Sequence, residues 1–240
     1  MHEPTVLLHG FTQTARSWDR VRRCLPMHID VIAPDLRGHG AASAARPVGF
    51  AEVAEDIAAQ APPRFNLCGY SMGGRLALQI ALAHPDRVAR LVLVSTTAGI
   101  EDSEERQARR AADERLADQL EREGLEAFAG RWGAQPLFAR QPVDVAAEAH
   151  ADRLRNDPAG LAAALRGLGT GAMAPLWDRL RELPMPATVL AGERDAKFLS
   201  IARRLAATLP HAHFAAVPGA GHALHLEAPC ALAGALTAWA

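Results

Sequence analysis

Short apolar runs alternate with longer amphipathic stretches along most of this chain. Apolar runs predict strands near residues 4–9, 29–34, 64–69, 90–95, 187–192 and 213–218. Helical periodicity predicts helices near residues 15–24, 50–60, 72–84, 197–208 and 228–239. Strands that alternate with helices in this way are typical of a mostly parallel sheet with helices on both faces. The predicted fold class is therefore α/β.

One long segment, residues 99–183, interrupts the alternation. It is rich in helix formers and contains no convincing strand. Its first helix carries acidic residues first and arginines later, an order that the helix dipole favours. We interpret this segment as a helical lid inserted between the strands near 90–95 and 187–192. A length of 240 residues suits one large domain, so we expect residues 1–240 to form a single domain that carries this lid.

Composition narrows the class of protein further. Hydrophobic residues make up 49% of the chain and charged residues 22%, and the formal net charge is −1. This balance gives no reason to expect nucleic acid or a membrane surface as a partner. No apolar run approaches the roughly 18 residues of a membrane span, and no basic-then-apolar leader opens the chain. We therefore expect no integral membrane segment and a cytoplasmic location.

The cysteines and histidines do not form a recognisable ligand pattern. Cys24, Cys68 and Cys230 lie far apart without C-x-x-C spacing, which predicts neither a disulfide framework nor a zinc site. Cys68 lies in a predicted strand and is interpreted as a small buried hydrophobe. No histidine or carboxylate cluster has metal-ligand spacing, so we expect no metal and no organic cofactor.

The stretch Gly69-Tyr70-Ser71-Met72-Gly73 lies between a predicted strand and a predicted helix. A G-x-S-x-G sequence in that setting is typical of the nucleophile elbow of α/β-hydrolases. The turn is tight, and small residues are needed on both sides of the serine because a Cβ there would strike the neighbouring backbone. Ser71 is then presented at a helix N-terminus, where unpaired N–H groups favour negative charge. The motif predicts that Ser71 is the reactive hydroxyl.

The partners of such a serine follow it in the order acid, then histidine, each after a strand. Asp195 follows the strand predicted near 187–192, and His222 follows the strand near 213–218 in a Gly-Ala-Gly-His sequence. We expect His222 to take the Ser71 proton and Asp195 to orient the imidazole. Glu193 is a weaker candidate for the acid, and His225 is a weaker candidate for the base.

Two backbone amides are expected to stabilise developing negative charge. The first predicted strand runs directly into His9-Gly10-Phe11. In this fold the loop after that strand supplies one oxyanion N–H, and the residue after the nucleophile supplies the other. The amides of Phe11 and Met72 hold those positions, and two fixed donors can contribute several kcal/mol where charge gathers on an oxygen.

Arginine supplies nearly all the positive charge, because Lys197 is the only lysine. Arg75 follows Ser71 by four residues on the elbow helix, a spacing that places both side chains on one helical face. A guanidinium in that position fits a substrate carboxylate with its forked donors. The alternative is a structural salt bridge to a core carboxylate. Lys197 is expected to pair or pack and not to form a Schiff base.

Several stretches together resemble one known family. They are residues 8–14, 69–75, 160–171, 192–198 and 219–227. Their sequences resemble those of a menaquinone-pathway lyase with the α/β-hydrolase fold, 2-succinyl-6-hydroxy-2,4-cyclohexadiene-1-carboxylate synthase. The resemblance spans nearly the whole chain, lid included. The elbow and histidine motifs are shared by many α/β-hydrolases, whereas the lid motif and Gly-Glu-Arg-Asp-Ala-Lys-Phe are much more specific.

The resemblance implies elimination without hydrolysis. Enzymes of this family release pyruvate from 2-succinyl-5-enolpyruvyl-6-hydroxy-3-cyclohexene-1-carboxylate, and their triad serine acts as a base. Those roles carry over to Ser71, His222 and Asp195, and the implied partner is a small polycarboxylate substrate without a cofactor. The substrate-binding residues that the resemblance implies are Tyr70, Arg75, Arg109, Trp132 and Arg153. Arg106 and Arg110 compete with Arg109 for its role, and Arg155 competes with Arg153.

Two other functions stay open on the sequence. A carboxylesterase or carbon–carbon bond hydrolase on the same scaffold would follow if the lid arginines face solvent. A ligand-binding receptor would keep the fold and triad but turn over little. Convergence of Arg75, Arg109 and Arg153 on Ser71 would favour the lyase over the hydrolase. The sequence fixes neither the oligomeric state nor whether the triad is assembled before substrate binds.

Overall fold

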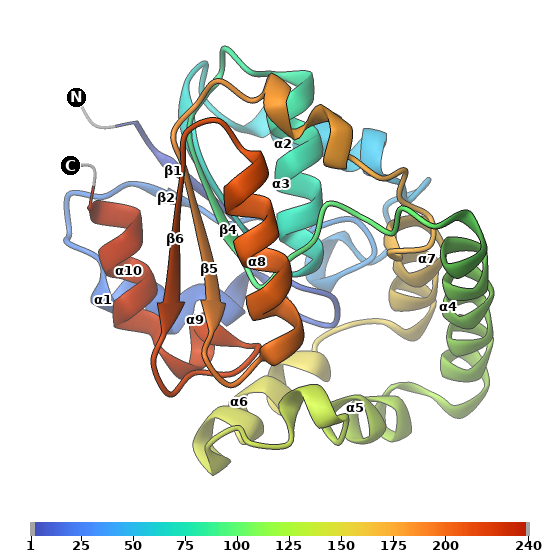
Figure 1. Cartoon of the computed structure of the whole chain (residues 1–240). Helices are drawn as coiled ribbons and strands as arrows, with labels where there is room; N and C mark the ends of the chain where they lie inside the picture. The colour runs from blue at the N-terminus through green and yellow to red at the C-terminus, as the bar shows by residue number, and fades with distance from the viewer. Residues whose placement is uncertain (1–2, 239–240) are drawn as a thin grey trace.

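The computed structural model describes residues 3–238, which contain one six-stranded sheet (Figure 1). Its strands are β1 (Thr5–Leu8), β2 (Val31–Ile32), β3 (Phe65–Tyr70), β4 (Val88–Val94), β5 (Ala187–Gly192) and β6 (Ala212–Val217). The strand order is β2-β1-β3-β4-β5-β6, and every neighbouring pair is parallel. All six predicted strands are present, which confirms the α/β fold class. The order places the ends of β1, β3, β5 and β6 at one edge of the sheet.

Helices follow the strands as the periodicity predicts. They are η1 (Ala15–Trp18), α1 (Asp19–Cys24), η2 (Gly40–Ala42), α2 (Phe50–Gln60), α3 (Met72–Ala83), α8 (Ala196–Thr208), α9 (Leu224–Glu227) and α10 (Pro229–Thr237). The first predicted helix is divided into a 3-10 turn and a short α-helix. The last predicted helix, near residues 228–239, corresponds to α10, and its predicted end at residue 239 lies outside the described residues. The short helix α9 precedes it and was not predicted.

Alternating side chains of the strands bury both faces of the sheet. Val6 and Leu8 of β1 point into a core that α2, α3 and α8 cover. Leu7 points to the opposite face, where it joins a second core built with α1, α9 and α10. Successive strand residues point to opposite faces, so a strand buried on both sides reads as a continuous apolar run. This explains why the predicted strands show no polar alternation.

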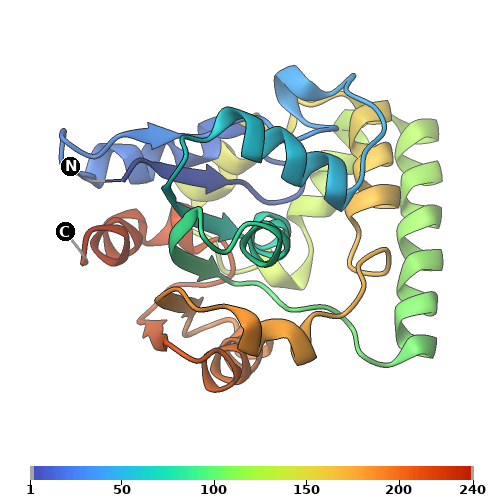
Figure 2. The ribbon, with the colours of Figure 1, turned by 90° about the horizontal axis from the view of Figure 1, so that it is seen from above.

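Residues between β4 and β5 form the helical segment beside the sheet (Figure 2). Its elements are α4 (Ser103–Glu123), α5 (Leu125–Gly133), η3 (Pro136–Phe138), α6 (Val143–Arg153), α7 (Pro158–Leu168) and η4 (Trp177–Glu182). The long helix α4 runs alongside α7, and a small apolar core with Phe128, Leu161 and Leu165 joins α4, α5 and α7. Asp144 and Glu148 of α6 pair with Arg20 of α1, which ties this part of the segment to the sheet domain.

A disulfide between Cys24 and Cys230 corrects the sequence analysis, which predicted no disulfide. The two residues are 206 positions apart in sequence, and their Cα atoms are 5.1 Å apart. Helices α1 and α10 pack side by side on one face of the sheet, and this packing brings the cysteines together (Figure 1). Spacing along the chain cannot report such a pairing, because only the fold creates the proximity. Cys68 is a free, buried thiol, as expected.

Among residues 3–238, no helix is long and apolar enough to cross a bilayer. The longest helix, α4, is strongly polar along its length.

Candidate active site

Ser71 occupies the sharp turn between β3 and α3. Its backbone angles are φ 51° and ψ −108°, a conformation that a residue with a side chain rarely adopts. A Cβ at Gly69 would collide with the backbone of Gly73 and Gly74, and a Cβ at Gly73 would collide with the carbonyls of Leu8 and His9. The turn is held by the Ser71 amide, which donates to the Val94 carbonyl at 2.9 Å. The G-x-S-x-G sequence therefore forms the tight turn that it predicts.

The structure brings His222 and Asp195 to Ser71 in a continuous chain of hydrogen-bonding groups. His222 Nε2 lies 3.3 Å from Ser71 Oγ, and His222 Nδ1 lies 2.6 Å from Asp195 Oδ2. Asp195 Oδ1 also accepts from the Phe198 amide at 3.3 Å, which fixes the carboxylate. His222 is 2% exposed and Asp195 7% exposed. A buried carboxylate at Nδ1 leaves Nε2 free to receive the serine proton.

Aromatic rings surround the His222 imidazole. The ring centroids of Phe198, Tyr70 and Phe138 lie 4.5, 5.4 and 6.0 Å from that of His222. Gly192 allows the end of β5 to approach the loop after β6, because a Cβ there would collide with the carbonyls of Ala220 and Gly221. This packing restricts the orientation of the imidazole toward Ser71.

The two weaker candidates lie away from Ser71 Oγ. Glu193 accepts a hydrogen bond from the Gly219 amide at 3.1 Å and is exposed. His225 is fully buried against the rings of Tyr70 and Trp18, with centroid separations of 4.1 and 5.1 Å. Neither of its ring nitrogens has a hydrogen-bond partner among the described residues. The geometry thus favours Asp195 and His222 for the acid and the base.

The backbone amides of Phe11 and Met72 lie at the ends of β1 and β3, which are neighbours in the sheet. Within residues 3–238, neither amide donates a hydrogen bond. Met72 is the first residue of α3, so its N–H is one of the unpaired donors of a helix start. Two free N–H groups beside Ser71 fit a site where an oxygen gains negative charge.

Ser71 opens into a cavity of about 330 Å³ whose wall carries three cations. Arg75, Arg109 and Lys197 all line it, together with Ser71 and His222. The remaining lining is mostly apolar and includes Phe11, Trp132, Leu137, Leu168 and Phe198. The Phe11 and Trp132 rings pack edge to face at 5.0 Å. A largely apolar hollow with a few fixed cations suits a compact anion with several carboxylates.

Arg75 is oriented by the helical segment between β4 and β5. Its Nη2 donates to the Leu168 carbonyl at 2.6 Å, and it forms no ion pair among the described residues. A structural salt bridge, the alternative considered from the sequence, is therefore absent from residues 3–238. Burial lowers the pKa of Arg75 to about 10, the nearby Arg109 adds to this shift, and Asp113 opposes it. Because this guanidinium is desolvated, a carboxylate that binds beside it would stabilise its charge.

Only one of the three neighbouring lid arginines reaches the cavity. Arg109 lines it, whereas Arg106 donates to the carbonyls of Ile100 and Glu101 at 2.8 and 3.0 Å. Arg110 is exposed and does not line the cavity. The structure thus places Arg109, and not its neighbours, beside Ser71.

Arg153 and Tyr70 lie behind the cavity wall. Arg153 is buried, and its guanidinium lies 5.4 Å from the centroid of the Phe138 ring, which in turn contacts His222. Tyr70 is buried between His222 and His225, and burial raises the pKa of its hydroxyl. Neither side chain lines the cavity. The predicted convergence on Ser71 therefore holds for Arg75 and Arg109 but not for Arg153.

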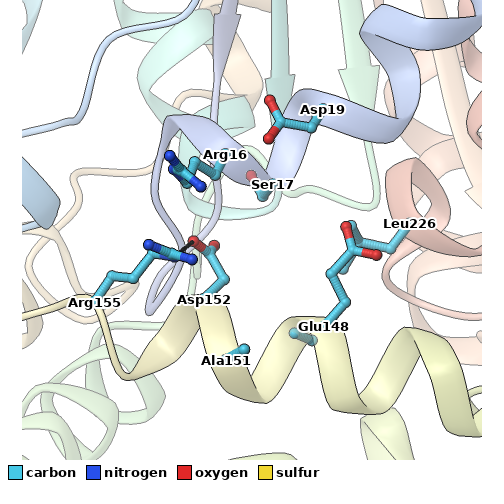
Figure 3. A pocket seen from close by; sticks show the side chains of 9 residues that line it. Arg16, Ser17, Asp19, Glu148, Ala151, Asp152, Arg155 and Leu226 are labelled. Carbon is cyan, nitrogen blue, oxygen red and sulfur yellow. Dashed lines mark ion pairs between the residues drawn. The ribbon is translucent and has the colours of Figure 1, made fainter.

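Arg155, the competitor of Arg153, faces a different hollow (Figure 3). This hollow measures about 150 Å³ and lies between η1 and α6. Arg155 lies 3.9 Å from Asp152, whose carboxylate also accepts from the amide and hydroxyl of Thr14 at 3.0 and 2.5 Å. The charges here are mixed, and Ser71 does not line the hollow. Arg155 thus does not line the Ser71 cavity.

Lys197 packs against an aromatic ring, as the sequence predicts, because its Nζ lies 5.9 Å from the Phe198 ring centroid. It also lines the Ser71 cavity, which the sequence analysis does not predict. Gln135, Leu137 and Thr170 also line the cavity and carried no signal in the sequence. For Lys197 a signal existed, because it lies in the first turn of α8, the helix that directly follows Asp195.

Buried histidines predict a loss of stability in acid. Burial lowers the pKa of His225 to about 3, and it also lowers the pKa values of His9 and His39. The unfolded chain, with a histidine pKa near 6.5, then binds more protons than the folded chain below that pH. The contribution of these histidines to the free energy of unfolding should be complete above about pH 6.5. Below that pH the free energy of unfolding should fall by up to ~1.4 kcal/mol per pH unit for each histidine.

His225→Phe tests this expectation by urea unfolding at several pH values between 7.5 and 4.5. The slope of the unfolding free energy against pH reports how many protons the chain takes up on unfolding. In the variant that number should be smaller by about one, because residue 225 can no longer bind a proton when the chain unfolds. His211→Phe is the matched control, since His211 is exposed. Equal slopes for His225→Phe and the wild type would contradict the expectation.

Comparison with known proteins identifies the family. The Alpha/beta hydrolase family matches residues 5–235. A 2-succinyl-6-hydroxy-2,4-cyclohexadiene-1-carboxylate synthase of Klebsiella pneumoniae is 34% identical over 96% of this chain and 91% of its own. A Bacillus subtilis protein provisionally given the same name is 39% identical over 95% of this chain and 86% of its own.

Solved structures agree with the sequence comparison. MenH from S. aureus superposes with a TM-score of 0.91 at 31% identity, over 98% of this chain and 92% of that one. A thermophilic esterase from Thermogutta terrifontis, solved with malate bound, has a TM-score of 0.86 at 30% identity, over 100% and 89% of the two chains. The chain therefore belongs to the α/β-hydrolase family, and within it to the 2-succinyl-6-hydroxy-2,4-cyclohexadiene-1-carboxylate synthases.

Proposed function

We propose that this chain eliminates pyruvate from 2-succinyl-5-enolpyruvyl-6-hydroxy-3-cyclohexene-1-carboxylate to give 2-succinyl-6-hydroxy-2,4-cyclohexadiene-1-carboxylate. The observation that carries the proposal is the placement of Arg75, Arg109 and Lys197 around the cavity of Ser71. Ester hydrolysis by a triad needs no such cations, whereas a substrate with several carboxylates does. The family to which the chain belongs supports the same reaction.

The names of substrate and product define the bond changes. The C2–H bond, next to the succinyl ketone, breaks, and its electron pair forms the C2–C3 double bond. The C3–C4 double bond moves to C4–C5, and the C5–O bond to the enolpyruvyl group breaks. Pyruvate leaves as its enolate and takes up a proton on carbon. The step involves no oxidant and no water.

The triad suits the removal of that proton. In the proposal, His222 Nε2 accepts the Ser71 proton, and Ser71 Oγ then removes the proton from C2. Asp195 stabilises the imidazolium that forms. Negative charge grows on the ketone oxygen of the succinyl group, where the Phe11 and Met72 amides would receive it. No covalent acyl intermediate is required.

The cations are assigned to the carboxylates. The substrate carries three carboxylates, on the ring, on the enolpyruvyl group and at the end of the succinyl chain. Arg75, Arg109 and Lys197 would hold them, and Trp132 would pack against the ring. Tyr70 and Arg153 would act from behind the wall by supporting His222 and Phe138. Residues 99–183 would act as the lid that sets substrate choice.

Ester hydrolysis is the second candidate, and one observation favours it. The Thermogutta terrifontis esterase shares 30% of its residues with this chain and the same fold. A Ser-His-Asp arrangement with two free amides is also what acyl transfer uses.

The cytoplasmic location and the independence from metal or cofactor stay predictions.

The test is wild-type turnover of two substrate classes. Pyruvate release from the enolpyruvyl substrate is coupled to lactate dehydrogenase, and a panel of short aryl esters is assayed in parallel. We expect kcat/KM for pyruvate release to exceed that for any ester by at least about a hundredfold. Ester cleavage without pyruvate release would leave a hydrolase. Tight binding of the substrate with negligible turnover of either class would leave the ligand-binding receptor.

A further inference from the structure

Asp113 is a buried carboxylate on the cavity side of α4 that the proposed reaction leaves without a role. Its side chain is 6% exposed, and its Oδ1 accepts from Arg109 Nε at 2.9 Å. Its Oδ2 is buried and has no hydrogen-bond partner among the described residues. A carboxylate held this deeply is costly unless cations compensate it, so its neighbours should explain its presence.

Two arginines of the cavity wall supply that compensation. Arg109 bonds to Asp113 directly, and Arg75 lies close enough for Asp113 to oppose the fall in its pKa. Arg75 and Arg109 repel each other, and the Nε of Arg75 is itself buried without a partner in residues 3–238. One negative charge between two like charges reduces this repulsion and fixes where each guanidinium points.

The end of α7 is shaped around the same carboxylate. A Cβ at Gly169 would lie 2.5 Å from Asp113 Oδ2, so only glycine leaves room for the carboxylate there. The preceding carbonyl, that of Leu168, accepts from Arg75 Nη2. A Cβ at Gly171 would collide with the backbone of Arg110 on α4. The Leu-Gly-Thr-Gly sequence of the lid thus seats α4 so that Asp113 and Arg75 meet the same turn.

We propose that Asp113 is a positioning residue, which holds Arg109 and Arg75 in the geometry that receives two substrate carboxylates. It does not touch the substrate, since it does not line the cavity. The proposal deepens the proposed function and depends on it for its kinetic test. It also explains why the lid motif around Gly169 contains glycine where α7 ends.

The kinetic test uses Asp113→Asn, which keeps the shape and one acceptor but removes the charge. If Asp113 positions the arginines, KM for pyruvate release should rise about tenfold while kcat changes less than about threefold. If Asp113 only repels the anionic substrate, removing its charge should lower KM, which would overturn the proposal. A lower Tm with unchanged KM would show a purely structural role and would also overturn it.

Asp118→Asn is the matched control. Asp118 lies on the same helix, but its side chain is 47% exposed and pairs with Arg166 outside the cavity. Its replacement removes an equal charge and should leave KM within about twofold of the wild type. Gly169→Ala approaches the same carboxylate from α7 and should raise KM as Asp113→Asn does.

A second measurement does not depend on the reaction. Arginine modification by phenylglyoxal, mapped by mass spectrometry, reports how firmly each guanidinium is held. Arg109 should react several-fold faster in Asp113→Asn than in the wild type or in Asp118→Asn. Equal rates would overturn the positioning role even if pyruvate is released. Faster modification in a protein that releases no pyruvate would support the positioning role and refute the proposed function.

Discussion

Ser71→Ala should abolish nearly all pyruvate release, with kcat reduced by about a thousandfold or more. The reason is geometric, because Ser71 Oγ is 3.3 Å from His222 Nε2 and opens directly into the cavity. His222 Nε2 lies behind Ser71 Oγ, so without the hydroxyl no base would reach the C2 proton of a substrate that binds in the same position. The cations of the wall are untouched, so the dissociation constant of the substrate should change little.

The measurement pairs single-turnover kinetics with calorimetric binding. Ser103→Ala is the control, since Ser103 is an exposed serine at the start of α4. His222→Ala should be as inactive as Ser71→Ala, because the two residues act as a unit. If Ser71→Ala stayed within about tenfold of the wild type while His222→Ala was inactive, the imidazole itself would be the base.

The role of Ser71 as a base and not as a nucleophile has its own readout. Intact-mass spectra during turnover should show no adduct on the wild-type protein. An acyl adduct that forms with aryl esters and vanishes in Ser71→Ala would support hydrolysis instead. Because both chemistries lose activity in Ser71→Ala, the mass spectrum separates what the kinetics alone cannot.

Local patterns predict much of the fold. The strands at β3 and β5 are buried on both sides, so their apolar runs are continuous and stand out from the helices. The sequence predicts that Ser71, Asp195 and His222 lie together because each follows such a strand, and parallel strands end at one edge of the sheet. The structure then places the three side chains within hydrogen-bonding distance, as that argument expects.

Contacts between distant segments could not be predicted in the same way. The disulfide joins residues at opposite ends of the chain, and only the packing of α1 against α10 brings them together. The choice of Arg109 over Arg106 and Arg110 depends on the rotation of α4 about its axis, which its weakly amphipathic sequence does not fix. The position of Asp113 beside the arginines could not be predicted for a related reason, since it depends on how α4 packs against Gly169 and Arg75, which lie on other segments.

Arg75 carries the largest expected effect on substrate binding. Arg75 lines the cavity, its Nε is buried, and its guanidinium is held by a single carbonyl acceptor, that of Leu168. Such a group keeps donors available for a carboxylate while the surrounding protein shields the pair from water. Its removal should therefore cost more than the loss of an exposed ion pair.

Arg75→Ala should raise KM for pyruvate release about a hundredfold, with a smaller fall in kcat. Cleavage of neutral aryl esters, where any is detectable, should be unaffected because those substrates have no carboxylate for Arg75 to bind. Arg75→Lys should recover only part of the affinity, since an ammonium cannot donate in a fork. Arg115→Ala, at an exposed position on α4, is the control. If Arg75→Ala weakened ester cleavage and pyruvate release equally, Arg75 would support the elbow helix and would not recognise the substrate.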